Sequence, residues 1–292
     1  MQSFEGKIAV VTGAAGGIGR CLVDRLIEAG ASVLMGDIDA IKLEQSKADI
    51  CAERGVPESR IATQVCDVTK EESVQALASK AYAEFGSVDL LFNNAGVGLG
   101  EAQRKLWDLP VSDWNWGMAV NTMGLVYGIR AFVPRLIAAG KEAVIVNTLS
   151  NNGGLRTIPN TPIYAASKAA ATSLTEALHQ QLRKETQGRV RVAGLFPGPY
   201  VVNTGILASK KNRPDAFGGA DAKGVAYQRM EDLVAATGLK MQLTEPDEVA
   251  QYALQGVREG NFWLIPASND ADEYIRQRTA CILARGTPPL AW

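Results

Sequence analysis

The sequence predicts an α/β fold with a doubly wound parallel sheet of about seven strands, in a single domain that spans residues 1–292. Three observations predict this fold class. Short β-branched and apolar runs alternate with longer stretches of helical periodicity. A glycine-rich turn directly follows the first apolar run. No linker, repeat or low-complexity tract divides the chain, and 292 residues with 47% hydrophobic side chains suffice for a large core.

The predicted strands are short runs rich in valine, isoleucine, leucine and phenylalanine. They occupy residues 8–11, 32–35, 61–65, 90–92, 143–146, 190–193 and 262–265. Because parallel strands need long crossover connections, the alternation with helices favours a parallel sheet over an antiparallel one.

The helices are predicted from apolar residues that recur every three or four positions. In the first helix Ile18, Leu22 and Leu26 share one face, and Gly30 ends the segment. The same periodicity predicts helices over residues 41–53, 71–85, 114–139, 162–186 and 246–259.

The segment 199–243 does not fit this alternation. Its apolar positions are scattered, and it is rich in turn-forming residues, among them Gly205, Pro214, Gly218, Gly219 and Gly238. Long irregular stretches inside compact domains are usually functional lids or disordered segments. We predict a substrate-binding lid inserted within the domain, with disorder as the alternative.

The charge and cysteine patterns exclude several classes of function. With 30 Lys+Arg against 31 Asp+Glu and no block of like charges, the chain is not expected to bind nucleic acid or a membrane surface. Apolar runs are shorter than the roughly 18 residues of a membrane span, and no secretory signal precedes them. Four cysteines without C-x-x-C spacing predict reduced thiols, a cytoplasmic protein and no metal site. The one histidine, His179, is expected to be a surface or packing residue.

A glycine-rich loop, Thr12 to Gly19, follows the first strand and runs into the first helix. In that context glycines let the backbone approach a pyrophosphate, and the N-terminus of the helix favours its negative charge. We therefore predict that Gly13, Gly17, Ile18 and Gly19 bind a dinucleotide. The alternative is a turn that merely requires positive φ.

An acidic residue, Asp37, stands at the end of the second strand, eighteen residues beyond Gly19. At this place a carboxylate accepts hydrogen bonds from the adenosine ribose hydroxyls, and it repels the 2′-phosphate of NADP. Ile38 follows instead of an arginine, and Gly16 occupies a place where a basic side chain could meet that phosphate. The prediction is NAD, with a solvated aspartate as the alternative.

A tyrosine and a lysine, Tyr164 and Lys168, lie four residues apart in a helix expected to begin with Thr161 as N-cap and Pro162 as its first residue. This spacing places both side chains on one helical face. A phenol titrates near pH 10, so a nearby cation that lowers its pKa would suit it to acid/base work near neutrality. Taken alone, the pair is common on exposed helices.

Five motifs taken together resemble the short-chain dehydrogenase/reductase superfamily. They are Thr12-Gly13-x-x-x-Gly17-x-Gly19, Asn93-Asn94-Ala95-Gly96, Ser150, Tyr164-x-x-x-Lys168 and Pro197-Gly198. The resemblance is close over residues 5–200 and implies a Rossmann-like fold with hydride transfer between a nicotinamide cofactor and an alcohol or ketone. It further implies that Tyr164 is the acid/base, that Lys168 holds the ribose and that Ser150 bonds the substrate oxygen.

The same resemblance implies roles for further residues. Asn121 would hold a water connected to Lys168. Asp67 and Val68 would contact the adenine, Asn94, Ala95 and Gly96 would lie beside the adenine ribose, and Pro197, Gly198 and Thr204 would lie near the nicotinamide. Ser150 precedes Tyr164 by one residue more than the commonest family spacing, which leaves Asn151 at the commoner place. Helices 114–139 and 162–186 resemble the family's dimer interface, so a homodimer or homotetramer is expected.

The residues near the expected pocket predict a lipophilic secondary alcohol or ketone as substrate, rather than a sugar or an acid. They are Leu155, Ile158, Pro159, Tyr200, Ile206 and Leu207. Arg156 is either a surface arginine or a group that holds a carboxylate.

Two alternatives to an NAD-dependent dehydrogenase remain. One is an NADPH-dependent carbonyl reductase, which Asp37 disfavours. The other is a non-catalytic NAD-binding regulator, which the tyrosine-lysine pair disfavours.

Overall fold

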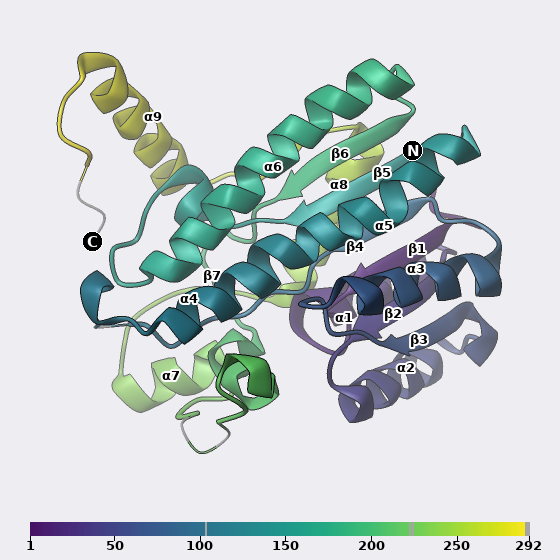
Figure 1. Ribbon diagram of the computed structural model, residues 1–292, viewed down its shortest axis with the longest axis horizontal. Coiled ribbons are helices and arrows are strands. Elements are labelled where there is room, and N and C mark those ends of the chain that lie inside the picture. The colour runs from purple at the N-terminus through teal and green to yellow at the C-terminus, as the bar shows by residue number, and fades with distance from the viewer. Residues whose placement is uncertain (103, 222, 224, 290–292) are drawn as a thin grey trace.

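The central element of the chain is a parallel sheet of seven strands in the order β3-β2-β1-β4-β5-β6-β9 (Figure 1). The computed structural model describes residues 1–102, 104–221, 223 and 225–289. Residues 222 and 224 of the predicted lid, and 290–292 of the predicted domain, lie outside this description. The strands are β1 (Ile8–Thr12), β2 (Ser32–Asp37), β3 (Ile61–Val65), β4 (Leu90–Asn93), β5 (Ala143–Thr148), β6 (Val190–Leu195) and β9 (Trp263–Leu264). The predicted single α/β domain is confirmed.

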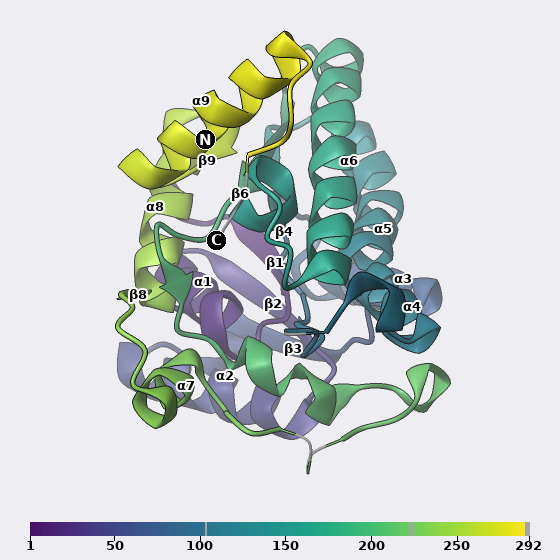
Figure 2. The same cartoon turned by 90° about the vertical axis from the view of Figure 1, so that its left-hand side faces the viewer.

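Helices cover both faces of the sheet (Figures 1 and 2). One layer holds α1 (Gly17–Glu28), α2 (Ala40–Arg54) and α8 (Pro246–Glu259), and the other holds α3 (Glu71–Phe85), α4 (Val111–Met118), α5 (Gly124–Ala139) and α6 (Pro162–Thr186). Side chains alternate between the two faces of a strand. Val11 therefore packs in one core cluster with Leu22 of α1, and Val10 packs in the other with Phe132 of α5.

The helix predicted over 114–139 begins earlier and contains a π-helical turn, Ala119–Met123, between α4 and α5. By length and composition alone the run Val111–Ala139 could cross a membrane, with a mean hydropathy of 1.2, whereas the sequence analysis expected no span. In the fold its Trp116, Phe132 and Leu136 are buried in the core cluster that also contains Val10 of β1 and Leu178 of α6. A core helix passes the same test of length and hydropathy.

Two helices were not predicted, α7 (Met230–Thr237) and α9 (Asn269–Ala284). Helix α9 follows the last strand and begins at Ser268, whose side chain accepts a hydrogen bond from the Ala271 N–H. None of the described side chains of α9 is fully buried, so the sequence carries little apolar periodicity there. In Figures 1 and 2 this helix lies at the top of the molecule.

The predicted lid, residues 199–243, has regular structure in its described part. It contains strand β7 (Val201–Val202), which pairs with β8 (Leu243–Thr244), the 3-10 turns Gly205–Asn212 and Asp215–Phe217, and helix α7. A buried ion pair of 2.6 Å between Arg213 and Asp113 joins the segment to α4. The described part is thus not a structureless loop, and its role as a lid stays a prediction.

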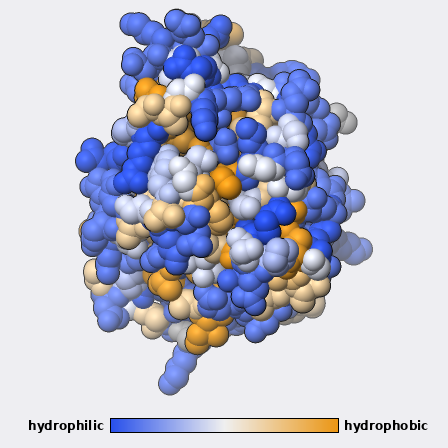
Figure 3. Space-filling model, turned by 90° about the vertical axis from the view of Figure 1, so that its right-hand side faces the viewer, coloured by the Kyte–Doolittle hydropathy of each residue, from blue (hydrophilic) through white to orange (hydrophobic). Residues whose placement is uncertain are grey.

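Hydrophilic side chains cover most of the molecular face in Figure 3, with hydrophobic ones scattered among them. Scattered exposed apolar residues are ordinary on protein surfaces. The four cysteines are free thiols. The His179 ring packs edge-on against Phe262 with a centroid separation of 4.7 Å, which confirms the prediction of a packing residue.

Candidate active site

A cavity of about 1410 Å³ lies at the carboxyl ends of the strands, around the point between β1 and β4 where the strand order reverses. Most of the predicted site residues line it: Gly13, Gly17, Ile18, Asp37, Ile38, Asp67, Val68, Asn94, Ala95, Gly96, Ser150, Tyr164, Lys168, Pro197 and Thr204. Gly19, Asn121 and Gly198 do not line this cavity. In the described part of the chain, no group of three or more His, Cys, Asp or Glu side chains is placed to hold a metal ion.

The glycine loop leaves no room for side chains. Gly13 and Gly17 have positive φ, +65° and +52°, and a Cβ on Gly19 would lie 2.0 Å from the Gly13 carbonyl oxygen. Helix α1 begins directly after Gly16, and no side chain caps its first N–H groups. Exposed backbone donors at a helix N-terminus fit a pyrophosphate. The loop therefore suits the dinucleotide predicted from the sequence.

The carboxylate of Asp37 is held at the cavity by backbone donors. Its oxygens accept hydrogen bonds from the N–H groups of Ala15, at 2.9 Å, and Asp39, at 3.0 Å. Burial raises the pKa of Asp37, and these two hydrogen bonds oppose that effect. Each carboxylate oxygen keeps further lone pairs for ribose hydroxyls.

A lysine that the sequence analysis missed lies beside the glycine loop. A Cβ on Gly16 would come within 2.6 Å of the Lys42 ammonium nitrogen, so a cation occupies the place where we expected no basic side chain. The signal was present in the sequence, because Lys42 stands in the first turn of the helix that follows Asp37. The adenosine end of the cavity thus carries both a carboxylate and a cation.

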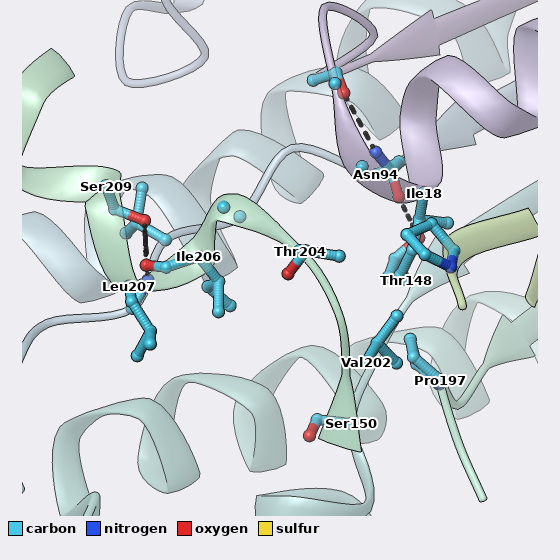
Figure 4. Close-up of a pocket in the computed structure, with 18 of the residues that line it drawn as sticks. Ile18, Asn94, Thr148, Ser150, Pro197, Val202, Thr204, Ile206, Leu207 and Ser209 are labelled. Carbon is cyan, nitrogen blue, oxygen red and sulfur yellow. Dashed lines mark hydrogen bonds between the residues drawn. The ribbon is translucent and has the colours of Figure 1, made fainter. Parts of the chain in front are cut away.

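The side chain of Asn94 ties three strand ends together. Its amide nitrogen donates to the carbonyl oxygens of Thr12 and Gly13, at 3.1 and 3.3 Å, and its amide oxygen accepts from the Thr148 hydroxyl at 3.1 Å. Asn94 and Thr148 lie on one side of the cavity in Figure 4, with Thr204 and Ser150 facing the same space. The floor of the site is therefore fixed by the chain's own hydrogen bonds.

The loop after β3 carries Asp67 and Val68, the predicted adenine contacts. The Asp67 carboxylate accepts hydrogen bonds from the N–H and the hydroxyl of Thr69, at 3.0 and 2.7 Å, and so forms a local turn. Both Asp67 and Val68 line the cavity on the side of Asp37. The contact with adenine itself stays a prediction.

The tyrosine and the lysine project from the first turns of α6 into the cavity. The Lys168 ammonium lies 5.9 Å from the Tyr164 ring centroid and donates to the Thr148 carbonyl oxygen at 2.7 Å. Burial lowers the pKa of Lys168 to about 8. Burial also raises the pKa of Tyr164, and a hydrogen bond with Ser150 opposes that rise. In the chain alone, the effect of burial on the Tyr164 pKa thus outweighs the lowering that was expected from a nearby cation.

Ser150, rather than Asn151, is the neighbour that opposes the rise in the Tyr164 pKa. Ser150 immediately follows Leu149 at the end of β5, and its hydroxyl oxygen also accepts the N–H of Asn152 at 3.1 Å. The turn that follows, Asn151–Leu155, has non-helical φ/ψ at Asn152 and Gly153. Ser150 and Asn151 both line the cavity.

Asn121 lies in the π-helical turn between α4 and α5, and hydrogen bonds to other segments hold its side-chain amide. Its oxygen accepts from the Val97 N–H at 2.9 Å, and its nitrogen donates to the Val97 carbonyl and the Ser167 hydroxyl, both at 3.1 Å. A Cβ on Gly96 would lie 3.4 Å from the Asn121 amide oxygen and 3.6 Å from the Lys168 ammonium. Asn121 thus lies close to Lys168, and its predicted water stays a prediction.

The segment after β6 closes the cavity beside the glycine loop. The Gly198 N–H donates to the Tyr252 hydroxyl at 3.2 Å, and that hydroxyl donates to the Phe196 carbonyl at 2.8 Å. Further along, the Thr204 methyl group would lie 3.2 Å from a Cβ on Gly17. Residues far apart in sequence therefore meet at the start of α1.

A buried glutamate, Glu101, holds the N-terminus of the catalytic helix. It is 1% exposed, and its two carboxylate oxygens accept the N–H groups of Ile163, at 2.8 Å, and Tyr164, at 2.9 Å. Thr161 is the N-cap residue and Pro162 the first residue of α6, as predicted, but the Thr161 side chain makes no cap hydrogen bond and accepts instead from the Asn152 amide at 2.7 Å. No local pattern reveals Glu101, which lies 62 residues before its nearer partner.

We expect Glu101→Ala to lower kcat about tenfold with little change in the KM for the nicotinamide cofactor. Losing a charged cap costs about 1–2 kcal/mol and frees the first turn that carries Tyr164. Glu101→Gln, which retains one acceptor oxygen, should recover part of the rate. Steady-state kinetics well below the melting temperature measure both. The control is Glu72→Gln, an exposed acid in the first turn of α3. An unchanged kcat in Glu101→Ala would refute the positioning role.

The doubly wound sheet, the glycine cradle at its switch point and the tyrosine-lysine pair define a nucleotide-dependent oxidoreductase. The family model for short chain dehydrogenases matches residues 7–215. The chain therefore belongs to the short-chain dehydrogenase/reductase family, as its motifs indicated.

Several relatives and solved structures are similar over much or all of the chain. A CLA biosynthesis dehydrogenase/reductase of Lactiplantibacillus plantarum is 29% identical over 291 residues, which cover 99% of this chain and 97% of that protein. A 1-deoxy-11-beta-hydroxypentalenate dehydrogenase of Streptomyces exfoliatus is 38% identical over 195 residues, covering 67% and 68%. The crystal structure of a short chain dehydrogenase/reductase from Burkholderia phymatum in complex with NAD superposes with a TM-score of 0.86, at 33% identity and 100% coverage of both chains.

Proposed function

We propose that this oxidoreductase interconverts a lipophilic secondary alcohol and the corresponding ketone, with NAD as cofactor and Tyr164 as the acid/base. One observation carries the proposal. Ser150 and Tyr164, with the Lys168 ammonium 5.9 Å from the Tyr164 ring centroid, line the same cavity as the glycine cradle. A proton donor or acceptor and a cofactor site thus face one space.

The chain's own residues would divide the work. Ser150 and Tyr164 would both hydrogen-bond the substrate oxygen, and Tyr164 would take up or release its proton. When bound, the nicotinamide would supply the hydride acceptor or donor, which protein side chains do not provide. Lys168 would hold the nicotinamide ribose and favour the phenolate of Tyr164, because a nearby positive charge stabilises the charged form.

The preference for NAD rests on Asp37, whose carboxylate would repel a 2′-phosphate. The Burkholderia phymatum structure in complex with NAD supports this choice. A metagenomic short-chain oxidoreductase in complex with NADP, at 26% identity, has the same fold with a TM-score of 0.64, so the fold alone does not decide between the cofactors. The preference for NAD or NADP therefore depends on the residues at the adenosine ribose.

The experiment that tests the function is reduced-nicotinamide absorbance with a panel of secondary alcohols, with NAD and NADP in parallel. We expect turnover with NAD and at least tenfold lower kcat/KM with NADP. Asp37→Ser should shrink that ratio by about tenfold, because it removes one unit of negative charge beside the 2′-position. The matched control is Asp39→Ser, which removes a neighbouring charge and keeps a capping side chain for α2. A wild-type protein that prefers NADP would overturn the NAD assignment, and Lys42→Met would then identify the cation responsible.

The lipophilic substrate is supported by apolar side chains around the cavity. Leu155, Ile158, Ile206, Leu207 and Tyr200 line it, whereas Pro159, which we expected there, does not. The names of the Streptomyces and Lactiplantibacillus relatives also indicate dehydrogenases. An apolar wall favours substrates that bury hydrocarbon.

We further propose a cytoplasmic homodimer or homotetramer. Exposed apolar side chains on the expected interface helices support the assembly, among them Met123 at 38% and Leu174 at 37% exposure. The free thiols support the compartment. Light scattering coupled to size-exclusion chromatography distinguishes a monomer from either oligomer.

A further inference from the structure

We propose that Arg156 binds a carboxylate of the substrate, so that the natural substrate is an amphiphilic hydroxy acid or keto acid. The proposal rests on the dehydrogenase function above and adds the charged group that orients the substrate. It also revises the sequence-based expectation of an uncharged molecule, which treated Arg156 as either a surface residue or a carboxylate site.

Arg156 is the arginine of the cavity lining that forms no ion pair in the described part of the chain. Three arginines among the described residues line the cavity, Arg20, Arg156 and Arg229. Arg20 pairs with Glu53 at 3.1 Å, and Arg229 pairs with Glu231 at 2.9 Å. In the described part of the chain Arg156 forms no ion pair, and its Nε atom is buried without a hydrogen-bond partner.

A buried donor without an acceptor is costly, and native proteins seldom leave one. The Arg156 guanidinium lies 6.0 Å from the ring centroid of Tyr274 on α9, so an aromatic ring flanks it and supplies no carboxylate. Guanidinium presents a planar fork of N–H donors that matches a carboxylate with two parallel hydrogen bonds. A carboxylate of the substrate can therefore supply the acceptor that the Arg156 Nε–H lacks.

The backbone of Arg156 is fixed relative to the reacting groups. Its N–H donates to the Asn151 carbonyl at 2.8 Å, and its carbonyl accepts the Gly153 N–H at 2.6 Å. This turn begins directly after Ser150, which lines the same cavity as Tyr164. Backbone hydrogen bonds thus connect the position of Arg156 to the turn that follows Ser150, which suits a substrate held at both ends.

Apart from its polar groups at Arg156 and at Ser150 and Tyr164, the cavity is lined by several apolar side chains. Leu155 and Ile158 flank Arg156 in sequence, and Ile206 and Leu207 come from the predicted lid. Figure 4 shows Ile206 and Leu207 across the cavity from Thr148. These walls favour a hydrocarbon body between a carboxylate and a secondary hydroxyl.

Other charged side chains that line the cavity form no ion pair with Arg156 in the described part of the chain. Glu101 accepts two backbone N–H groups at the start of α6. Lys211 donates to the Gln228 side chain. Asp270, in the first turn of α9, lines the cavity without forming an ion pair with Arg156 in the described structure. The positive charge of Arg156 is therefore left for a ligand.

The test compares hydroxy acids, with the secondary hydroxyl at several distances from the carboxylate, with their methyl esters under NAD-dependent turnover. We expect kcat/KM for the best acid to exceed that of its ester by about tenfold to hundredfold, the range for a charge-assisted hydrogen bond. Arg156→Gln should remove this advantage and leave the ester within about twofold. Arg156→Lys should restore part of it. Equal rates with acid and ester in the wild type would overturn the proposal.

A second readout does not depend on turnover. Calorimetric binding of decanoate and of methyl decanoate, which carry no hydroxyl, is measured on the wild type and on Arg156→Gln. Selective binding of decanoate that Arg156→Gln abolishes supports the carboxylate site even if no alcohol is oxidised, in which case only the proposed function fails. Equal binding of the two compounds overturns the site even if alcohols are oxidised.

The matched control is Arg278→Gln. The exposed Arg278 on α9 donates to the Leu155 carbonyl at 3.1 Å, so it contacts the same turn, but it does not line the cavity. We expect this variant to keep the preference for the acid. If Arg278→Gln and Arg156→Gln lose the preference equally, the effect comes from loosening the turn, and the proposal is refuted.

Discussion

Tyr164→Phe is expected to lower kcat by about 10³-fold, while the affinity for NAD stays within about threefold of the wild-type value. The substitution removes one oxygen and keeps the ring that packs beside the Lys168 ammonium. Ser150 would still bond the substrate oxygen but would supply no acid or base. The loss should therefore appear in kcat, with the KM for NAD almost unchanged.

Single-turnover kinetics and fluorescence titration with NADH measure the two quantities separately. The matched control is Tyr82→Phe, since the buried Tyr82 hydroxyl has no hydrogen-bond partner in the described structure and does not line the cavity. That variant should turn over at the wild-type rate. If Tyr164→Phe keeps a rate within tenfold of the wild type, another group is the acid/base and the proposed mechanism is wrong.

The parts of the fold that the sequence predicted well depend on local patterns. Runs such as 61–65 are apolar and β-branched, and the strand β3 has the predicted bounds. Helices α3, α6 and α8 also begin and end where periodicity indicated, and α6 starts at the predicted Pro162. The glycine loop was readable because its function demands both its composition and its place after the first strand.

The parts that were missed depend on contacts between distant segments. Glu101 replaces the expected cap at Thr161 through a carboxylate that arrives from another loop. Most residues of helix α9 are exposed, so its sequence has no apolar stripe that would predict a helix. These features arise from tertiary structure, which spacing along a chain does not encode directly.

Lys168→Met is expected to stop catalysis and yet to stabilise the folded protein at pH 7. Burial lowers the pKa of Lys168 from 10.5 to about 8, so folding below pH 8 must keep a proton on a buried ammonium. At about 1.36 kcal/mol per pKa unit this costs about 3 kcal/mol of folding free energy. The Thr148 carbonyl loses its donor in the variant, which costs about 1–3 kcal/mol. The expected net gain is about 0–2 kcal/mol.

The sign of the pH dependence separates this cause from ordinary repacking. Between pH 8 and 10.5 the unfolded chain keeps the Lys168 proton and the folded chain releases it, so the wild type gains stability as the pH rises. The advantage of Lys168→Met should therefore be greatest at pH 7 and should shrink, then reverse, towards pH 10.5. Urea unfolding of both proteins at several pH values measures the difference.

The control for this series is Lys184→Met, an exposed lysine in the last turn of the same helix, for which no pH-dependent difference is expected. A Lys168→Met variant that is less stable than the wild type by the same amount at pH 7 and pH 10 would contradict the argument. If the gain appears together with a loss of at least about hundredfold in kcat, the site holds a buried ammonium at the expense of stability. A buried charge that lowers the stability of the fold while raising the rate is an instance of the trade-off between stability and activity at active sites.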